Sequence, residues 1–182
     1  MSELLAIVPD EVETSARALL KQACAKDLAI VTAESCTGGL VASLLTDVEG
    51  ASRAFERGFV VYTDEAKCEL LAVDNQVIAL CGAVSRETAI AMAEGALRRS
   101  RGDVSIAITG FAGPAGPDDE PGLVHFACAR SGRATAHREE HFGDVGRGPV
   151  RLQCLAVAIG MLRDAINESP SNLECPLPSN GT

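Results

Sequence analysis

Two short apolar runs, each ending in a glycine-rich turn, restrict the fold of this chain more than any other feature of its sequence. The run at 28–33 leads into "ESCTGG", and the run at 104–109 leads into "GFAGPAGP". Short, mainly apolar runs bounded by turn residues are typical of strands that are covered on both faces of a sheet. Because helical apolar patterns alternate with these runs, the sequence predicts an α/β fold.

The remaining segments complete this prediction. Helical patterns are expected at 9–24, 39–47, 64–71, 85–100 and 149–166, and the second half of 55–62 is strand-like. Two further runs, 123–129 and 134–142, flank "RSGR" and predict an antiparallel hairpin. We therefore expect a three-layer α/β/α domain with a mixed, mainly parallel sheet. A single domain is expected over 1–167, followed by a flexible tail over 168–182.

Charge and composition argue against two classes of partner. The net charge is -9, there is no Trp, and Tyr62 is the single Tyr. Proteins that bind single-stranded nucleic acid use a positive groove and aromatic stacking platforms, so nucleic acid is not an expected partner. No apolar run reaches the roughly 18 residues that a membrane span needs, so no membrane partner is expected either.

Cysteine usage and the N-terminal residues bear on location. The seven cysteines are an odd number without a C-x-x-C pair, which favours a reduced protein over a disulfide framework. The opening "MSELLAIVPDE" has acidic side chains and lacks the basic segment of a signal peptide. These features predict a cytoplasmic protein.

The turn after the first apolar run can carry chemistry or simply end a strand. Backbone N–H groups at the start of a helix are unpaired and favour an anion, while Gly38 and Gly39 let a ligand approach the backbone. Ser35 and Cys36 are the candidate nucleophiles, and because they are adjacent they point in different directions. The alternative is that Ser35 or Thr37 only caps the following helix.

A serine nucleophile needs a base. His125, His137 and His141 all fall in the predicted hairpin, and the H-x3-H spacing of the last two, without further spaced ligands, does not indicate a metal site. Lysine can replace histidine when its surroundings favour the neutral amine. Lys67, five residues after Tyr62, is the candidate base; the alternative is an ordinary solvated lysine.

Five ordered motifs add a resemblance to these residues. "TAESCTGG", "GFVVYTDEAK", "GAVSRETA", "ITGFAGP" and a closing "FGD" with "VR" together resemble the CinA C-terminal-domain family, over about 11–166. The family's characterised enzymes are nicotinamide-nucleotide amidases. The resemblance implies an α/β/α domain that hydrolyses the carboxamide of nicotinamide mononucleotide, giving nicotinate mononucleotide and ammonia for NAD recycling. It implies no cofactor and no metal.

The resemblance also assigns roles by position. Ser35 is the nucleophile, Lys67 is the base, and Tyr62 relays a proton or orients Lys67. The nearby Asp64 and Glu65 are expected to point away from Lys67 toward solvent. The residues implied to bind substrate are Glu34, Cys36, Thr37, Gly38, Gly39, Thr109, Gly110, Gly113, Arg147 and Arg151.

Two departures and two alternatives accompany this interpretation. "GDVGRGPVR" contains a two-residue insertion before Arg147 relative to the family pattern, and Thr109 replaces the usual serine of the second turn. The alternatives to an amidase are a non-catalytic nucleotide- or phosphate-binding module and a competence-related protein-interaction domain. A small-molecule nucleotide is the expected partner, and a homo-oligomer, a dimer or higher, is the expected assembly.

Overall fold

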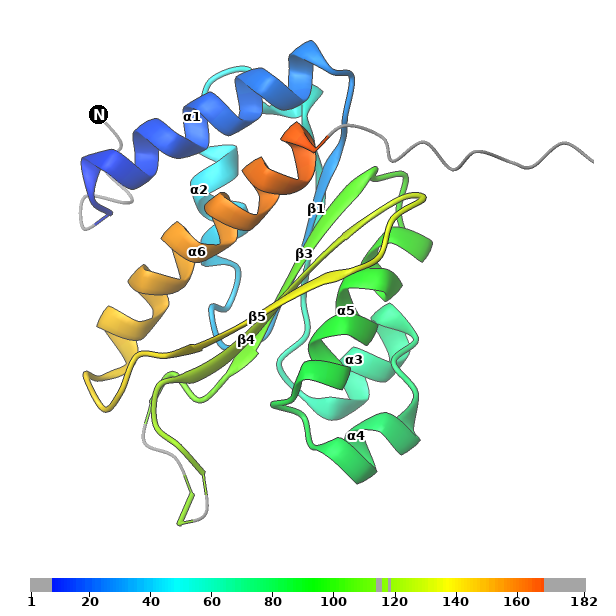
Figure 1. Cartoon of the computed structure of the whole chain (residues 1–182), viewed down its shortest axis with the longest axis vertical. Helices are drawn as coiled ribbons and strands as arrows, with labels where there is room; N and C mark the ends of the chain where they lie inside the picture. The colour runs from blue at the N-terminus through cyan, green and yellow to red at the C-terminus, as the bar shows by residue number, and fades with distance from the viewer. Residues whose placement is uncertain (1–7, 114–115, 118, 169–182) are drawn as a thin grey trace, which may run out of the picture.

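A five-stranded sheet with helices on both faces forms the part of the chain that the computed structural model describes, residues 8–113, 116–117 and 119–168 (Figure 1). The strand order is β2-β1-β3-β4-β5. The strands are β1 (Ile30–Glu34), β2 (Phe55–Val60), β3 (Val104–Gly110), β4 (Leu123–Arg130) and β5 (Ala136–His141).

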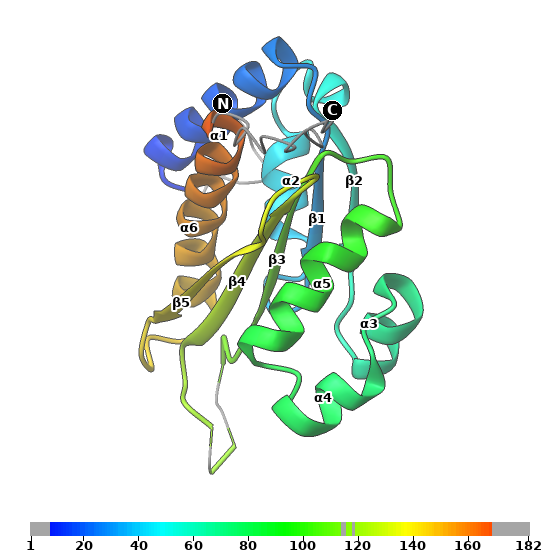
Figure 2. The same cartoon turned by 45° about the vertical axis from the view of Figure 1, so that its right-hand side comes forward.

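The helices divide between the two faces of the sheet. One layer holds α1 (Asp10–Ala25), α2 (Leu40–Thr46) and α6 (Arg147–Asn167); the other holds α3 (Asp64–Leu71), α4 (Asn75–Cys81) and α5 (Arg86–Arg98) (Figure 2). A single 3-10 turn, η1 (Ala51–Arg53), precedes β2. The predicted α/β/α layering is therefore confirmed.

Strand pairing places the ends of β1 and β3 at the same edge of the sheet. β1 pairs in parallel with β2 and with β3, whereas β3–β4 and β4–β5 are antiparallel. The sheet is mixed, as predicted, with parallel pairing on one side of β3 and antiparallel pairing on the other. In parallel sheets ligands bind at the carboxyl ends of the strands. That edge holds the turn after Glu34 and the turn after Gly110.

Two apolar clusters, one on each face, hold the layers together. β1 is buried over its full length and β3 over all but its last residue, because β1 and β3 contribute side chains to both clusters. Each fully buried Val, Leu or Ile side chain stabilises the fold by about 1.5–3 kcal/mol before entropy is counted. The most buried strands are thus the two that end at the candidate site.

The contact between α3 and α5 depends on a residue without a side chain. Gly95 of α5 lies so close to the end of α3 that a Cβ there would stand 2.1 Å from the Leu71 carbonyl oxygen. That separation is far inside van der Waals contact, so only glycine lets the two helices approach this closely. Gly95 thereby sets the position of α3 relative to the sheet.

Differences from the sequence prediction are small and have local causes. The first strand begins at Ile30, because Leu28 is still part of the turn after α1. The sequence did not predict α4, which is only seven residues long and buries none of them. Of the predicted tail, residues 169–182 lie outside the described residues. None of the described helices combines the length and apolar character needed to cross a membrane.

Candidate active site

The Glu34 carboxylate organises the turn after β1. Glu34 is fully buried, its Oε2 accepts a hydrogen bond from the Val41 N–H at 3.0 Å, and its Oε1 accepts one from the Ala42 N–H at 2.8 Å. A carboxylate at a helix N-terminus satisfies unpaired donors and complements the macrodipole. Glu34, expected as a substrate-binding residue, is therefore fully engaged in holding α2 against the end of β1.

Two consecutive glycines allow the chain to return to that carboxylate. Gly38 has φ 61° and Gly39 has φ 88°, both in the left-handed region that side chains disfavour. A Cβ on Gly39 would also crowd Val60 at 3.3 Å. These two residues are required by the backbone path, which brings Val41 within reach of Glu34 only seven positions earlier.

Ser35 and Cys36 both line a cavity at the edge of the sheet, and Cys36 also contacts the apolar core. Ser35 continues the β1–β3 ladder, donating its N–H to the Ile108 carbonyl at 3.0 Å, and it borders a cavity at the edge of the sheet. Cys36 belongs to the apolar cluster on the α6 side together with Cys154. The adjacent Cys36 thiol, together with burial, raises the pKa of the Cys154 thiol. Both candidate nucleophiles therefore line the same cavity as Lys67, and they differ in that Cys36 also packs into the apolar cluster.

The candidate base is Lys67, whose side chain is only 2% exposed. It lies on α3, whose first turn is capped by the Thr63 hydroxyl. Lys67 Nζ donates to Asp64 Oδ1 at 3.4 Å. The expectation that Asp64 points away from Lys67 is therefore wrong: the residues are separated by three positions on one helix, which places their side chains on the same face.

The two candidate catalytic residues line one cavity of about 220 Å³. Ala83, Val84 and Phe111 form its apolar wall, and Tyr62 and Arg147 lie at its rim. No hydrogen bond joins Ser35 to Lys67 within the described residues. The cavity is smaller than the roughly 300–1,000 Å³ of pockets that enclose a whole drug-sized ligand. It can therefore receive one ring of a ligand while the rest stays outside.

Unused backbone donors lie beside Ser35. The N–H groups of Cys36, Thr37 and Gly39 make no hydrogen bond to another described residue, whereas Gly38 and Leu40 donate within the turn. Free N–H groups next to a nucleophile form the kind of site that stabilises an oxyanion. Because Glu34 occupies the helix donors at 41 and 42, the unpaired N–H groups nearest Ser35 are those of the turn itself.

The two arginines have different surroundings. Arg151 donates to the Thr37 carbonyl from Nε at 3.1 Å and from Nη2 at 2.6 Å, so its guanidinium supports the turn. Arg147 is exposed, borders the cavity and makes no ion pair with any described residue. A Cβ on Gly113 would meet the Arg147 guanidinium at 2.5 Å, so this group lies directly against the second glycine-rich turn.

The second glycine-rich turn forms part of the cavity wall, but its one side-chain hydroxyl, that of Thr109, is used in a hydrogen bond to the backbone. The Thr109 hydroxyl donates to the Ala83 carbonyl at 2.7 Å, which ties β3 to the segment before α5. Gly110 lines the cavity, and a Cβ there would stand 2.7 Å from the Leu123 carbonyl oxygen. Thr109, predicted to bind substrate, therefore uses its hydroxyl for structure. Parts of the predicted loop, at 114–115 and 118, lie outside the described residues.

Tyr62 is 64% exposed and borders the cavity without a hydrogen bond to Lys67. A phenol at the rim can meet the outer part of a ligand more readily than it can orient a lysine buried beneath. A larger hollow of about 600 Å³ lies elsewhere, along the segment 46–55. Its titratable groups are the carboxylates of Asp47 and Glu49, and it holds neither a base nor a cation to work with them.

Sequence reasoning missed three features of this site. It did not identify Glu34 as a helix cap, the Asp64–Lys67 contact, or the wall formed by Ala83, Val84 and Phe111. The spacing of Asp64 and Lys67 on one predicted helix could have revealed the contact. The other two features depend on how distant segments meet, and no local pattern signals them.

The fold and the cavity define a class of protein. It is an α/β domain in which a serine and a buried lysine line one cavity at the carboxyl edge of the sheet. Comparison with known proteins gives the family. The model of the CinA C-terminal domain matches residues 12–166, and the chain belongs to this family.

Individual relatives agree with the assignment. The nicotinamide-nucleotide amidohydrolase PncC of Escherichia coli K12 is 44% identical over 141 residues, covering 76% of this chain and 84% of that protein. A putative competence-damage inducible protein of Symbiobacterium thermophilum is 50% identical over 123 residues, which are 66% of this chain and 29% of that longer protein. The crystal structure of the competence/damage inducible protein CihA from Agrobacterium tumefaciens has a TM-score of 0.86 and 42% identity, covering 90% of this chain and 100% of that one.

Proposed function

We propose that this chain hydrolyses the carboxamide of nicotinamide mononucleotide, releasing ammonia and nicotinate mononucleotide. The observation that supports this most directly is that Ser35 and the buried Lys67 line the same cavity. The similarity to a nicotinamide-nucleotide amidohydrolase over 84% of that protein's length supports the substrate. NAD recycling is the process that such a reaction would serve.

The reaction begins with attack of Ser35 Oγ on the carboxamide carbon. Neutral Lys67 accepts the hydroxyl proton, and the N–H groups of Cys36 and Thr37 stabilise the negative oxygen of the tetrahedral intermediate. The Lys67 amine is buried in the lining of this cavity and lies 3.4 Å from Asp64 Oδ1. Contacts between a nucleophile and its base are often long without substrate and shorten when it binds.

Collapse of the intermediate breaks the C–N bond. Lys67 returns its proton to the departing nitrogen, which leaves as ammonia, and an ester links the nicotinoyl group to Ser35. Lys67 then deprotonates a water molecule that hydrolyses this ester and regenerates the serine. The sequence of steps needs no metal and no cofactor.

The cavity accounts for how the nucleotide is held. A pyridine ring with its carboxamide fits the apolar wall, with Phe111 as its aromatic member. The ribose and phosphate then extend past the rim, where the exposed Arg147 offers a guanidinium to the phosphate. Tyr62 contacts the sugar side of the ligand from the same rim. This arrangement replaces the shared role first expected for Arg147 and Arg151.

A direct assay tests the proposal. Purified protein is incubated with nicotinamide mononucleotide, and ammonia and nicotinate mononucleotide are measured, with nicotinamide riboside as the substrate that lacks phosphate. We expect turnover of the mononucleotide, with weaker use of the riboside. Binding without turnover would indicate a nucleotide-binding module instead, and the absence of both would favour a protein-interaction domain.

Four further expectations stay predictions. We propose a single domain over 1–167, a homo-oligomer in solution, a cytoplasmic location and no binding of nucleic acid. Light scattering of the purified chain measures the second, fractionation of the source cells measures the third, and a shift assay with single-stranded DNA measures the last.

A further inference from the structure

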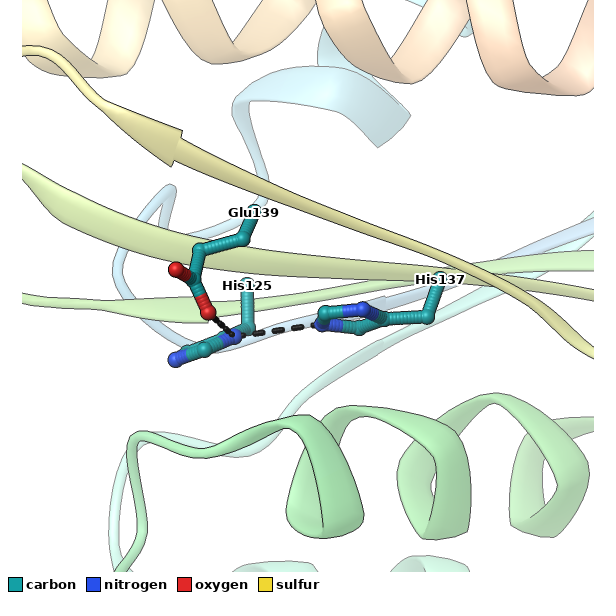
Figure 3. A group of neighbouring side chains, drawn as sticks. All are labelled: His125, His137 and Glu139. Atoms are coloured by element: carbon teal, nitrogen blue, oxygen red, sulfur yellow. Dashed lines mark hydrogen bonds and ion pairs between the residues drawn. The ribbon is translucent and has the colours of Figure 1, made fainter.

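Three side chains of the β4–β5 hairpin converge on one point away from Ser35 and Lys67. His125 of β4 and His137 and Glu139 of β5 direct their polar atoms toward one another (Figure 3). His125 Nδ1 lies 3.1 Å from His137 Nε2 and 3.4 Å from Glu139 Oε2. The proposed amidase reaction uses none of these groups.

The hairpin register produces this convergence. His125 pairs with Glu139 across the antiparallel ladder, and directly opposed residues point to the same face. His137 precedes Glu139 by two positions, so it shares that face as well. The sequence spacing singles out His137 and His141, but the pairing of strands brings His125 to His137. The expectation that the histidines form no metal site rested on sequence spacing alone.

The separations suit a shared ion. Zinc binds imidazole nitrogen at about 2.0–2.1 Å, so tetrahedral ligand atoms lie about 3.3 Å apart. The measured 3.1 Å and 3.4 Å bracket that value, and all three donor atoms lie within 4.8 Å of one another. Two imidazoles and one carboxylate are a common set of three protein ligands that leaves further positions to solvent.

Each imidazole has a second ring nitrogen that lies outside the contact between the three residues. Figure 3 shows the second nitrogen of His125 pointing away from the other two residues. That nitrogen, and His137 Nδ1, make no hydrogen bond to a described residue. Each ring can therefore carry its proton there and turn a lone pair toward the ion.

Glu139 is itself held in place. Its Oε1 lies 3.0 Å from His141 Nε2, and His141 Nδ1 lies 2.7 Å from Glu120 Oε1. A carboxylate with one oxygen fixed by an outer partner presents the other in a defined direction. Arg86 and Glu87, at the start of α5, are charged groups that face this cluster from the neighbouring helix.

We propose that His125, His137 and Glu139 bind a divalent transition-metal ion of the zinc class, with His141 as a positioning residue. The ion joins β4 to β5 at the level of the α5 N-terminus and stabilises the edge of the sheet. Two nitrogen ligands disfavour Mg²⁺ and Ca²⁺, which prefer oxygen. This site is separate from the proposed amidase reaction, which proceeds without it.

Calorimetric titration of metal-stripped full-length protein with zinc chloride tests the proposal. We expect one ion per chain and a higher melting temperature in zinc, since binding to the folded state alone stabilises it. Glu139→Gln and His137→Ala should each weaken binding by at least about 10-fold. Glu140→Gln, on the same strand but the opposite face, is the matched control and should bind as the unmodified chain does.

Cobalt(II) distinguishes this site from the cysteines. Cys24 and Cys81 are exposed and can bind zinc on their own, but cobalt bound through sulfur shows thiolate charge-transfer absorption. The proposal predicts that cobalt bound to the protein absorbs without the thiolate band. It also predicts that this cobalt absorption is lost in Glu139→Gln. Equal affinity in all variants, or no binding of zinc, would overturn the site and leave a simple His125–His137 hydrogen bond. Glu139 is partly exposed, so its variant folds even if His137→Ala does not.

Discussion

The Arg151 guanidinium, on α6, holds the Thr37 carbonyl with two hydrogen bonds, at 3.1 Å from Nε and 2.6 Å from Nη2. The turn beside Ser35 is therefore fixed from outside by a helix that comes 114 positions later in the chain. Glu34 fixes the same turn from inside through the N–H groups of Val41 and Ala42. Between these two supports, the N–H groups of Cys36 and Thr37 are held in place without being used.

Replacing Ser35 with alanine should abolish amide hydrolysis. The loss in kcat should be at least about 10³-fold, because no other group forms the acyl intermediate. The Glu34 carboxylate, and not the Ser35 hydroxyl, accepts the N–H groups at the start of α2, so stability should change by less than about 1 kcal/mol. Ammonia release and thermal unfolding measure the two effects. Cys36→Ala is the control and should retain turnover; the reverse pattern would make Cys36 the nucleophile.

Lys67→Arg should be nearly as damaging as Lys67→Met. The guanidinium stays protonated and cannot accept the Ser35 proton, although it keeps the positive charge beside Asp64. Loss of a general base typically costs about 10²–10⁴-fold in rate. Steady-state kinetics of the two variants decide the matter. A Lys67→Arg enzyme with near-normal kcat would mean that the residue acts only through its charge.

Alanine variants of Arg147 and Arg151 should change different kinetic constants. Arg147→Ala should raise KM for nicotinamide mononucleotide and leave kcat less affected, with a loss of about 1.5–3 kcal/mol of binding. The riboside serves as control, because it has no phosphate for Arg147 to bind. An unchanged KM would place the phosphate elsewhere.

Arg151→Ala should act mainly on the turn. It leaves the Thr37 carbonyl without its partner, so we expect a stability loss of about 1–3 kcal/mol and a lower kcat. Denaturant unfolding and steady-state kinetics measure both. A variant that only raises KM, with unchanged stability, would contradict the supporting role.

Glu34→Gln should destabilise the fold without altering the groups that line the cavity. The amide keeps one acceptor but turns an NH₂ group toward a backbone N–H of α2, so the cost should be about 1.5–3 kcal/mol. Urea unfolding gives the value, and Glu65→Gln, on an exposed part of α3, is the comparison. Equal stability of the two variants would show that the cap is dispensable.

Glu56 should contribute stability that depends on pH. Its hydrogen-bonded partner Arg57 lowers the pKa of Glu56, through contacts of 2.6 Å and 2.7 Å. A carboxyl whose pKa is lower in the folded state stabilises the fold above its unfolded pKa of about 4.3. That contribution disappears as the pH falls through the folded pKa. The difference in unfolding free energy between Glu56→Gln and the unmodified chain should thus be present at pH 7 and shrink in acid.

The regular elements were predictable because their signals are local. The apolar stripe of α1, the Ser85 cap of α5 and the turn sequence "RSGR" between β4 and β5 are each formed by residues close together in the chain, and each predicted element is present. The role of Glu34 was not predictable in this way. It depends on two left-handed glycines that bring α2 back over the end of β1.

The sequence predicted which residues belong to the candidate site better than it predicted their hydrogen-bond partners. The turn chemistry pointed to Ser35, and the motif order pointed to Lys67, and both line the cavity. The partners of Thr109 and Arg151 come from segments 26 and 114 positions away, so their hydrogen bonds could not be read from the sequence. The association of His125 with His137 likewise needed the strand register.

The close contact between Gly95 and Leu71 lets α5 determine where α3, and therefore the Lys67 amine, lies. α3 begins with the segment that carries Lys67 and ends at the residue against which Gly95 rests. A methyl group at position 95 must push that helix outward, and the amine of Lys67 would move with it. In a screen for inactive variants, Gly95→Ala would therefore lose activity as an active-site substitution does, although Gly95 does not line the cavity. Efforts to make this protein more robust by filling helices with alanine should begin anywhere but there.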